Sequence, residues 1–234
     1  MVSGRRPESA EVAVEQVVLG SHFVARAGFE DLTLGHVSVR GPDGSSMFIK
    51  RKGMALGEVA KDDVLRVDLD SADALAAPHM HLEAVMHFEA YRARPDVGCV
   101  VHAHPLYATA LGATDGRLET VSHDGVLFHD GIGRYDESSA LITTSEQGRK
   151  VAEALGQRRA VLLKNHGVMV VGEDVRWAVL ASLTLERAVQ MQIAASALGR
   201  IEPIPDDEAE AMFHDKYRDG FLDEYWDNWT RTSG

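Results

Sequence analysis

The spacing of apolar residues along the chain predicts four long helices. Three segments carry apolar residues at helical intervals, and a fourth opens with Thr144-Ser145-Glu146-Gln147, a pattern typical of a capping box. The helices are expected over residues 12–24, 80–94, 144–156 and 175–198, with Gly28, Pro95, Gly156 and Gly199 as their stops. The tail from Pro205 is acidic and aromatic, and we expect it to be helical too.

Short runs rich in β-branched residues predict the strands. They cover residues 33–40, 47–50, 64–70, 97–101, 160–164 and 168–171. Gly41-Pro42-Asp43-Gly44 joins the first two runs and Asn165-His166-Gly167 joins the last two, which is typical of hairpins. Because hairpins alternate with helices, the pattern favours a mixed or antiparallel sheet with helices packed on it over a doubly wound parallel sheet.

The whole chain resembles one ordinary cytoplasmic domain. Its 234 residues contain no internal repeat and no linker, so we expect a single domain over residues 1–234. The net charge of −12 argues against nucleic acid or an acidic membrane as a partner, but allows a small anionic substrate. The polar start, the lack of a long apolar run and the single cysteine, Cys99, predict a cytoplasmic protein.

Three histidines are candidate metal ligands. His102 and His104 follow an apolar strand, and residues two apart in a strand point to the same side. His166 lies in a tight turn between two apolar strands. Each signal is weak alone, since ordinary polar residues give the same patterns. Together they would make the three-ligand open site of a catalytic metal.

Glu83 is the candidate acid/base. It lies on the predicted helix of residues 80–94, directly before the strand that carries His102. A helix carboxylate is most often a solvated surface group. Here Leu82, Val85 and Met86 surround it, which indicates that this helix packs on the core.

Four motifs together resemble the class II aldolase/adducin family. In chain order they are Gly35-His36-Val37-Ser38-Val39-Arg40, then Glu83 followed by Tyr91-Arg92-Ala93-Arg94-Pro95-Asp96-Val97-Gly98, then Val101-His102-Ala103-His104-Pro105, and finally Lys164-Asn165-His166-Gly167. Glu83 precedes His102 by 19 positions and His166 follows His104 by 62, much as in the family pattern. The resemblance runs from about residue 10 to residue 200.

This resemblance implies a three-layer α/β/α sandwich around a mixed, mainly antiparallel sheet. It implies one divalent ion per subunit on His102, His104 and His166, and a catalytic Glu83 that also ligates the metal before substrate binds. Zinc is favoured, with manganese, cobalt and iron as alternatives. It also implies a homotetramer with active sites at subunit interfaces. The adducin branch lacks the metal histidines, so the intact set favours an enzyme.

The chain departs from the family's sugar-phosphate pattern where small polar residues cradle the phosphate. The three replacements are Gly35-His36, Lys50-Arg51-Lys52-Gly53 and His81-Leu82. We therefore expect no phosphate site, and assign substrate binding to Arg51, His79 and His81. Arginine binds carboxylates bidentately, and imidazoles stack on flat rings or hydrogen-bond to them. The alternative for Lys50-Arg51-Lys52 is an exposed basic end of a hairpin. The alternative for His79 and His81 is a second, competing metal site.

Among family members, the chain looks closest to decarboxylases of hydroxylated aromatic dicarboxylates such as 3,4-dihydroxyphthalate. The resemblance implies a metal-dependent lyase of aromatic catabolism that works through a metal-stabilised enolate. The alternatives are an aldolase or epimerase acting on a small hydroxy-carbonyl or sugar-phosphate compound, and a non-catalytic adducin-like assembly module. Whether His123, His129, Tyr217 or Tyr225 completes a neighbouring subunit's site is open at this point.

Overall fold

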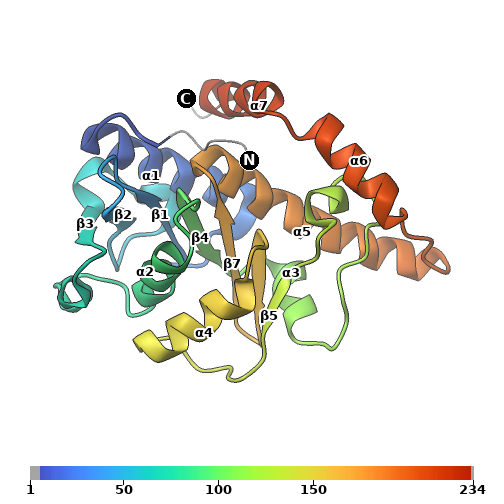
Figure 1. The fold of residues 1–234 in the computed structure, drawn as a ribbon, viewed down its shortest axis with the longest axis horizontal. Coiled ribbons are helices and arrows are strands. Elements are labelled where there is room, and N and C mark those ends of the chain that lie inside the picture. The colour runs from blue at the N-terminus through green and yellow to red at the C-terminus, as the bar shows by residue number, and fades with distance from the viewer. Residues whose placement is uncertain (1–5, 233–234) are drawn as a thin grey trace.

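A seven-stranded sheet forms the centre of the molecule (Figure 1). The computed structural model describes residues 6–232, and within them the strand order is β3-β2-β1-β4-β7-β6-β5. Neighbouring strands are antiparallel except β5 and β6, which are parallel. Helices cover both faces of the sheet, so the predicted three-layer architecture with a mainly antiparallel sheet is confirmed.

The elements follow one another as the apolar pattern predicts, with some additions. The strands are β1 (His36–Arg40), β2 (Ser46–Lys50), β3 (Val64–Asp68), β4 (Cys99–Ala103), β5 (Gly133–Tyr135), β6 (Ala160–Leu163) and β7 (Gly167–Gly172). The helices are α1 (Ala10–Val24), α2 (Ala84–Ala93), α3 (Leu106–Gly112), α4 (Ser145–Leu155), α5 (Val175–Leu198), α6 (Asp206–Lys216) and α7 (Asp219–Thr232). Short helical turns are η1 (Ala25–Phe29), η2 (Leu56–Glu58), η3 (Lys61–Asp63), η4 (Ala72–Ala76) and η5 (Gly125–Phe128).

Strand alternation divides the core between the two faces of the sheet. On β4, Val100 packs with α2 and α4, whereas Cys99 and Val101 pack with α1 and α5. Each fully buried valine or leucine contributes about 1.5–3 kcal/mol by leaving water. The alternation puts His102 on the same face as Val100, which is the face that α2 covers.

Two boundaries near the site differ from the sequence prediction. The central strand β4 runs from Cys99 to Ala103, so His102 lies inside it, opposite His36 on β1 and Met169 on β7. Helix α2 begins at Ala84 instead of residue 80, because the preceding residues form turns and His79 has a positive φ of 67°. Glu83 is thus the residue before the helix, and its placement on the helix was wrong.

Short elements escaped the sequence prediction. Helix α3 and strand β5 are brief, and β5 is defined only by its pairing with β6, which is distant in sequence. The tail is helical as expected, in the two helices α6 and α7. Across residues 6–232, each helix is too short or too polar to cross a membrane.

Candidate metal centre

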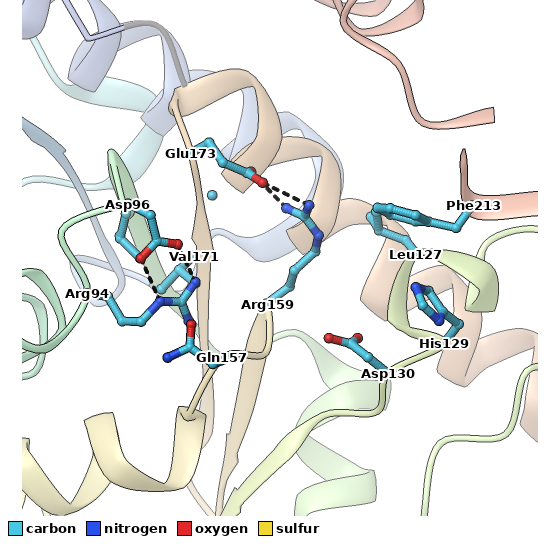
Figure 2. A pocket seen from close by; sticks show the side chains of 12 residues that line it. Arg94, Asp96, Leu127, His129, Asp130, Gln157, Arg159, Val171, Glu173 and Phe213 are labelled. Carbon is cyan, nitrogen blue, oxygen red and sulfur yellow. Dashed lines mark hydrogen bonds and ion pairs between the residues drawn. The ribbon is translucent and has the colours of Figure 1, made fainter. Parts of the chain in front are cut away.

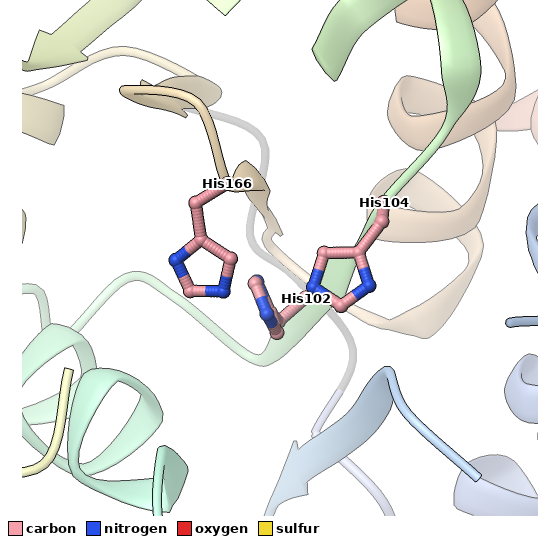
Figure 3. A group of neighbouring side chains, drawn as sticks. All are labelled: His102, His104 and His166. Carbon is pink, nitrogen blue, oxygen red and sulfur yellow. The ribbon is translucent and has the colours of Figure 1, made fainter. Parts of the chain in front are cut away.

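His102, His104 and His166 come together at one end of strands β4 and β7 (Figure 3). Each offers one ring nitrogen, and the three nitrogens lie within 4.8 Å of one another. His102 projects from β4, His104 directly follows that strand, and His166 directly precedes β7. Because β4 and β7 are antiparallel neighbours, the end of one strand meets the start of the other.

Hydrogen bonds fix the orientation of the first two rings. The Nδ1–H of His102 donates to the Val168 carbonyl at 2.9 Å, and that of His104 donates to the Asp31 carboxylate at 3.2 Å. A proton on Nδ1 leaves the Nε2 lone pair for a ligand, which is how metal-binding histidines are commonly held. Burial lowers the pKa of both imidazoles, so both stay neutral at pH 7.

The Nε2 atoms of His102 and His104 are buried and lack a hydrogen-bond partner within residues 6–232. Buried polar atoms are normally paired, so two unpaired nitrogens directed at one point require an explanation. A divalent ion bound by neutral imidazoles would satisfy both lone pairs. The residues present therefore fit a metal of this class.

Glu83 stands beside the histidines at the start of α2. Its Oε2 lies 3.7 Å from His102 Nε2 and 3.5 Å from His166 Nε2, while its Oε1 accepts a hydrogen bond from the Ile142 N–H at 2.9 Å. Burial raises the pKa of this carboxyl, but the His166 hydrogen bond, the neighbouring His102 ring and the Ile142 N–H together lower it to about 2. Glu83 is therefore an anion at neutral pH, held by its backbone contact next to the three nitrogens.

Gly167 allows the turn that carries His166 to approach β4. A Cβ atom at this position would lie 2.6 Å from the Ala103 carbonyl oxygen and 2.6 Å from Cδ2 of His104. Asn165 takes the left-handed conformation with φ of 53°, which asparagine adopts more readily than most residues. The Asn165-His166-Gly167 sequence thus fits the close contact between this turn and the His104 ring.

A pocket of about 130 Å³ opens beside the histidines. Its walls are mostly leucine and imidazole side chains, with one carboxylate and one primary amine. The lining residues are Thr33, Leu34, Gly35, His36, Lys52, His81, Leu82, Glu83, His104 and Leu141. The combination of apolar walls and a few polar groups is typical of a small-molecule site.

The three predicted substrate-binding residues take different positions. His81 lines the pocket. Arg51 pairs with Asp63 at 2.6 Å and is not among the lining residues, while His79 is exposed and also outside the lining. The substrate role of each of these residues stays a prediction.

The two lysines on either side of Arg51 lie in different environments. Lys52 reaches the pocket, whereas Lys50 is 0% exposed. The Lys50 ammonium donates to the carbonyls of Thr33 and Gly35 and to Nε2 of His81, at 3.1, 2.9 and 3.3 Å. Burial lowers the pKa of Lys50 to about 8, so it remains mostly charged at pH 7. It is therefore not part of an exposed basic hairpin end.

A second pocket lies at the opposite ends of β4 and β7 (Figure 2). Its cations are paired with their own carboxylates, Arg94 with Asp96 and Arg159 with Glu173. His129 also lines it, with its ring centroid 5.0 Å from that of Phe213. Because these charges are already neutralised within the chain, the pocket has less to offer an ionic ligand than the histidine site.

Two other candidate groups near the C-terminal helices also lie outside the histidine pocket. The hydroxyl of Tyr217 donates to the His123 carbonyl at 3.0 Å, and Tyr225 is 39% exposed on α7. Neither they nor His129 line the pocket of their own chain. Their roles in a neighbouring subunit stay predictions.

His87, which the sequence analysis passed over, lies next to the candidate centre, and His36 carries more contacts than expected. A ring nitrogen of His36 lies within 4.8 Å of the Glu83 carboxylate and of His102. Nδ1 of His36 is 2.7 Å from Nε2 of His87 on α2. The spacing of Glu83 and His87, four residues apart, was the available signal, because such residues share one face of a helix.

A sequence profile described as the Class II Aldolase and Adducin N-terminal domain matches residues 15–193. The chain belongs to this family. Its sheet and helices agree with a solved L-fuculose 1-phosphate aldolase from Glaciozyma antarctica PI12, with a TM-score of 0.79 over 94% of this chain and 88% of that one. The two sequences are 22% identical, so this comparison supports the fold alone.

Two curated relatives of this class II aldolase-family protein are more similar in sequence. One is the decarboxylase NovR of Streptomyces niveus, 32% identical over 192 aligned positions, with 80% of this chain and 71% of the relative covered. The other is the 4-hydroxy-3-prenylphenylpyruvate oxygenase/4-hydroxy-3-prenylbenzoate synthase of Streptomyces roseochromogenus subsp. oscitans, also 32% identical, over 80% and 69% of the two chains. The family thus contains both lyases and a protein named as an oxygenase.

Proposed function

We propose that this protein is a metal-dependent lyase that decarboxylates a hydroxylated aromatic or heteroaromatic dicarboxylate of the 3,4-dihydroxyphthalate type. The observation that carries the proposal is the convergence of His102, His104 and His166 beside Glu83, with two buried ring nitrogens that lack a partner within residues 6–232. The similarity to a decarboxylase supports decarboxylation over aldol cleavage.

The three histidines would hold one divalent ion, with Glu83 as a further ligand before substrate binds. Such an ion supplies Lewis-acid polarisation of a ring hydroxyl and of the carboxylate beside it. Zinc is favoured, and the all-imidazole set also suits iron, cobalt and manganese.

Glu83 is the proton carrier in this proposal. As an anion it takes the proton of the substrate's ring hydroxyl and delivers it to the ring carbon that bears the departing carboxylate. The resulting non-aromatic keto acid loses carbon dioxide, and the electron pair of the broken C–C bond returns to the ring oxygen. Solvent then restores the hydroxyl proton, so the net change replaces the carboxylate with hydrogen.

The pocket walls favour a flat, carboxylated substrate over a sugar phosphate. Leu34, Leu82 and Leu141 offer apolar contact, and His36 and His81 offer imidazole rings. Lys52 is the cationic side chain of the lining and would meet the second carboxylate. Among the lining residues Thr33 offers the one hydroxyl, in place of the set of serine hydroxyls that would suit a phosphate dianion.

We also propose that the protein assembles as a homotetramer with its sites at subunit interfaces. Exposed leucines near the pocket support an interface there. They are Leu32, Leu34, Leu82, Leu106 and Leu141, each at least 49% exposed. Apolar groups grouped around a polar site are typical of a surface that another chain covers.

The decisive experiment combines metal analysis of the purified protein with a carbon dioxide release assay on 3,4-dihydroxyphthalate and related acids. Each assay is run with and without chelator, and oxygen uptake is followed in parallel because one relative carries an oxygenase name. We expect about one metal per chain, chelator-sensitive release and no oxygen uptake.

The other outcomes contradict the proposal in distinct ways. Bound metal without carbon dioxide release would favour an aldolase or epimerase. Release coupled to oxygen uptake would indicate an oxygenase. Absence of bound metal would favour a non-catalytic adducin-like module.

A further inference from the structure

Four buried polar side chains form a hydrogen-bonded chain that ends at the metal pocket. The Tyr91 hydroxyl is 2.8 Å from Ser38 Oγ, Ser38 Oγ is 2.7 Å from His87 Nδ1, and His87 Nε2 is 2.7 Å from His36 Nδ1. Each of these residues is at most 2% exposed. The chain ends at His36, whose ring centroid is 4.9 Å from that of His102 and whose side chain lines the pocket.

Matched spacing on α2 and β1 explains why these side chains meet. Helix α2 and the residue before it present Glu83, His87 and Tyr91 at intervals of four, on one face. Strand β1 presents His36 and Ser38 at an interval of two, also on one face. Four helical residues advance about 6 Å, and two strand residues about 6.6 Å, so successive side chains of the two elements stay in step.

Tyr91, at the end of the series away from the pocket, fixes the direction of the hydrogen bonds. Among residues 6–232, Ser38 Oγ is the acceptor within reach of the Tyr91 hydroxyl. The Arg40 guanidinium over the Tyr91 ring has no lone pair to accept with, and it already donates to four backbone carbonyls. Tyr91 therefore donates to Ser38, since the opposite direction would leave a buried hydroxyl hydrogen without an acceptor.

The direction then propagates to the pocket. If Ser38 receives the Tyr91 hydrogen, its own hydrogen goes to Nδ1 of His87. The His87 and His36 rings are 0% and 2% exposed, and burial disfavours the charged form of an imidazole, so each ring carries a single proton. The His87 proton is on Nε2 and is donated to Nδ1 of His36, which leaves the His36 proton on Nε2.

We propose that this hydrogen-bonded series of side chains holds His36 as an Nε2–H donor that binds an anionic oxygen of the ligand in the metal pocket. Nδ1 of His36 is occupied by His87, so Nε2 is the nitrogen available to the pocket. Ser38, His87 and Tyr91 are positioning residues that act through it. The inference deepens the proposed function, and rests on it only for the identity of the ligand.

The charge around His36 favours a carboxylate or enolate oxygen as the acceptor. The His81 ring centroid lies 4.5 Å from that of His36, with the two rings tilted by 42°, and His81 Nε2 accepts from the buried Lys50 ammonium at 3.3 Å. A buried ammonium with two carbonyls and an imidazole as partners carries an uncompensated positive charge. An anionic oxygen held by the His36 N–H would be attracted by the positive charge of the Lys50 ammonium.

A tautomer measurement on the unaltered protein tests the hydrogen-bond direction. Histidines are labelled with nitrogen-15 in the zinc-loaded protein, and two-bond proton–nitrogen correlations distinguish Nδ1–H from Nε2–H rings. The signals of His36 and His87 are assigned by their loss in H36Q and H87Q. We expect both rings in the Nε2–H form. A proton on Nδ1 of His36, or on both of its nitrogens, would overturn the proposal.

A binding measurement tests the donor itself, with oxalate as the anionic probe and calorimetry as the readout. H36L should weaken oxalate binding to the zinc-loaded protein by about tenfold or more, because a hydrogen bond to a charged group is lost. H36Q, which keeps an N–H donor, should recover most of the affinity. S38A should weaken it by several-fold, while S182A, which removes a buried hydroxyl on α5 bonded to the Ala178 carbonyl, should leave it unchanged.

Metal content is measured in every variant so that loss of zinc is not mistaken for loss of the donor. Unchanged oxalate affinity in zinc-loaded H36L would overturn the proposal. If H36L loses its zinc, S38A and the tautomer measurement decide the question. Neither readout depends on decarboxylation: the expected tautomers and affinities without carbon dioxide release would refute the proposed reaction and leave His36 as the donor.

Discussion

At the scale of single residues, the candidate centre depends on where each imidazole keeps its proton. The hydrogen bonds from Nδ1 of His102 and His104 to fixed oxygens leave both Nε2 atoms as acceptors without partners among the described residues. His36 has the opposite arrangement, because its Nδ1 faces His87. In our proposals the same side chain thus serves as metal ligand at two positions and as N–H donor at a third.

Removing one metal-binding imidazole should empty the site. His102→Ala and His166→Ala are each expected to lower bound metal from about one per chain to less than about a tenth, because two remaining imidazoles do not complete a three-ligand site. Metal analysis after gel filtration checks this, with circular dichroism as the test of folding. His22→Ala is the control, since His22 bonds the Val59 carbonyl away from the site. Full metal content in both variants would refute the assignment.

Glu83→Gln should separate proton transfer from folding. The amide oxygen still accepts the Ile142 hydrogen bond, so the fold and the metal should persist. Turnover should fall by about 10²–10⁴-fold, because an amide cannot carry the proton. Carbon dioxide release measures the effect, and Glu89→Gln, a change at another buried carboxylate of α2, is the control expected to retain turnover. Near-normal turnover in Glu83→Gln would show that another group moves the proton.

At the scale of elements, the turn between β6 and β7 brings His166 to the other two histidines. The His166 N–H donates to the Leu163 carbonyl at 3.1 Å, which closes the turn. Gly167 then lies against Ala103 and the ring of His104, without room for a Cβ. A local turn sequence therefore determines whether His104 and His166, 62 positions apart in the chain, meet at one point.

Gly167→Ala should lower both stability and zinc affinity by displacing the backbone of the turn that carries His166. The added methyl would overlap the Ala103 carbonyl and the His104 ring, and such overpacking typically costs about 1–3 kcal/mol. For a chain of this size that corresponds to about 2–12 °C in Tm, and zinc affinity should fall as His104 shifts. Differential scanning calorimetry and a zinc titration measure both effects. Gly199→Ala, with no atom within 4 Å of its Cβ position, should change neither.

At the scale of the whole molecule, large exposed apolar side chains gather near the candidate site. Half of the exposed large hydrophobic residues in the described part of the chain belong to the segments that carry or adjoin the pocket. Leu82 directly precedes Glu83, and Leu141 directly precedes the residue whose N–H binds it. Burying such groups against another chain would gain about 25 cal/mol for each Å² of apolar surface removed from water.

The proposed assembly gives a direct prediction for the mass in solution. Sedimentation equilibrium should give about 100 kDa, four times the 25.5 kDa chain, as expected for a closed symmetric oligomer. Leu106→Glu should shift the protein to smaller species, because Leu106 is 71% exposed next to the site and a charge there opposes burial. Leu106→Met should keep the mass. A monomeric wild-type protein would contradict the assembly.

The sequence alone determined the features that depend on local periodicity. Residues two apart put Val100 and His102 on one face of β4, a capping box opened α4, and tight turns specified antiparallel neighbours. These follow from backbone geometry that repeats over a few residues. The same regularity predicted a mixed or antiparallel sheet with helices packed on it, whereas the three-layer sandwich was what the family resemblance implied.

Only the tertiary structure decided which side chains meet. It turned Arg51 toward Asp63, buried the Lys50 ammonium beside His81, and began helix α2 at Ala84, one residue after Glu83. It also paired His36 with His87, which are 51 positions apart. Periodicity specifies the face on which a residue lies, whereas the partner on the opposing element depends on how helix and sheet pack, and that requires the whole fold.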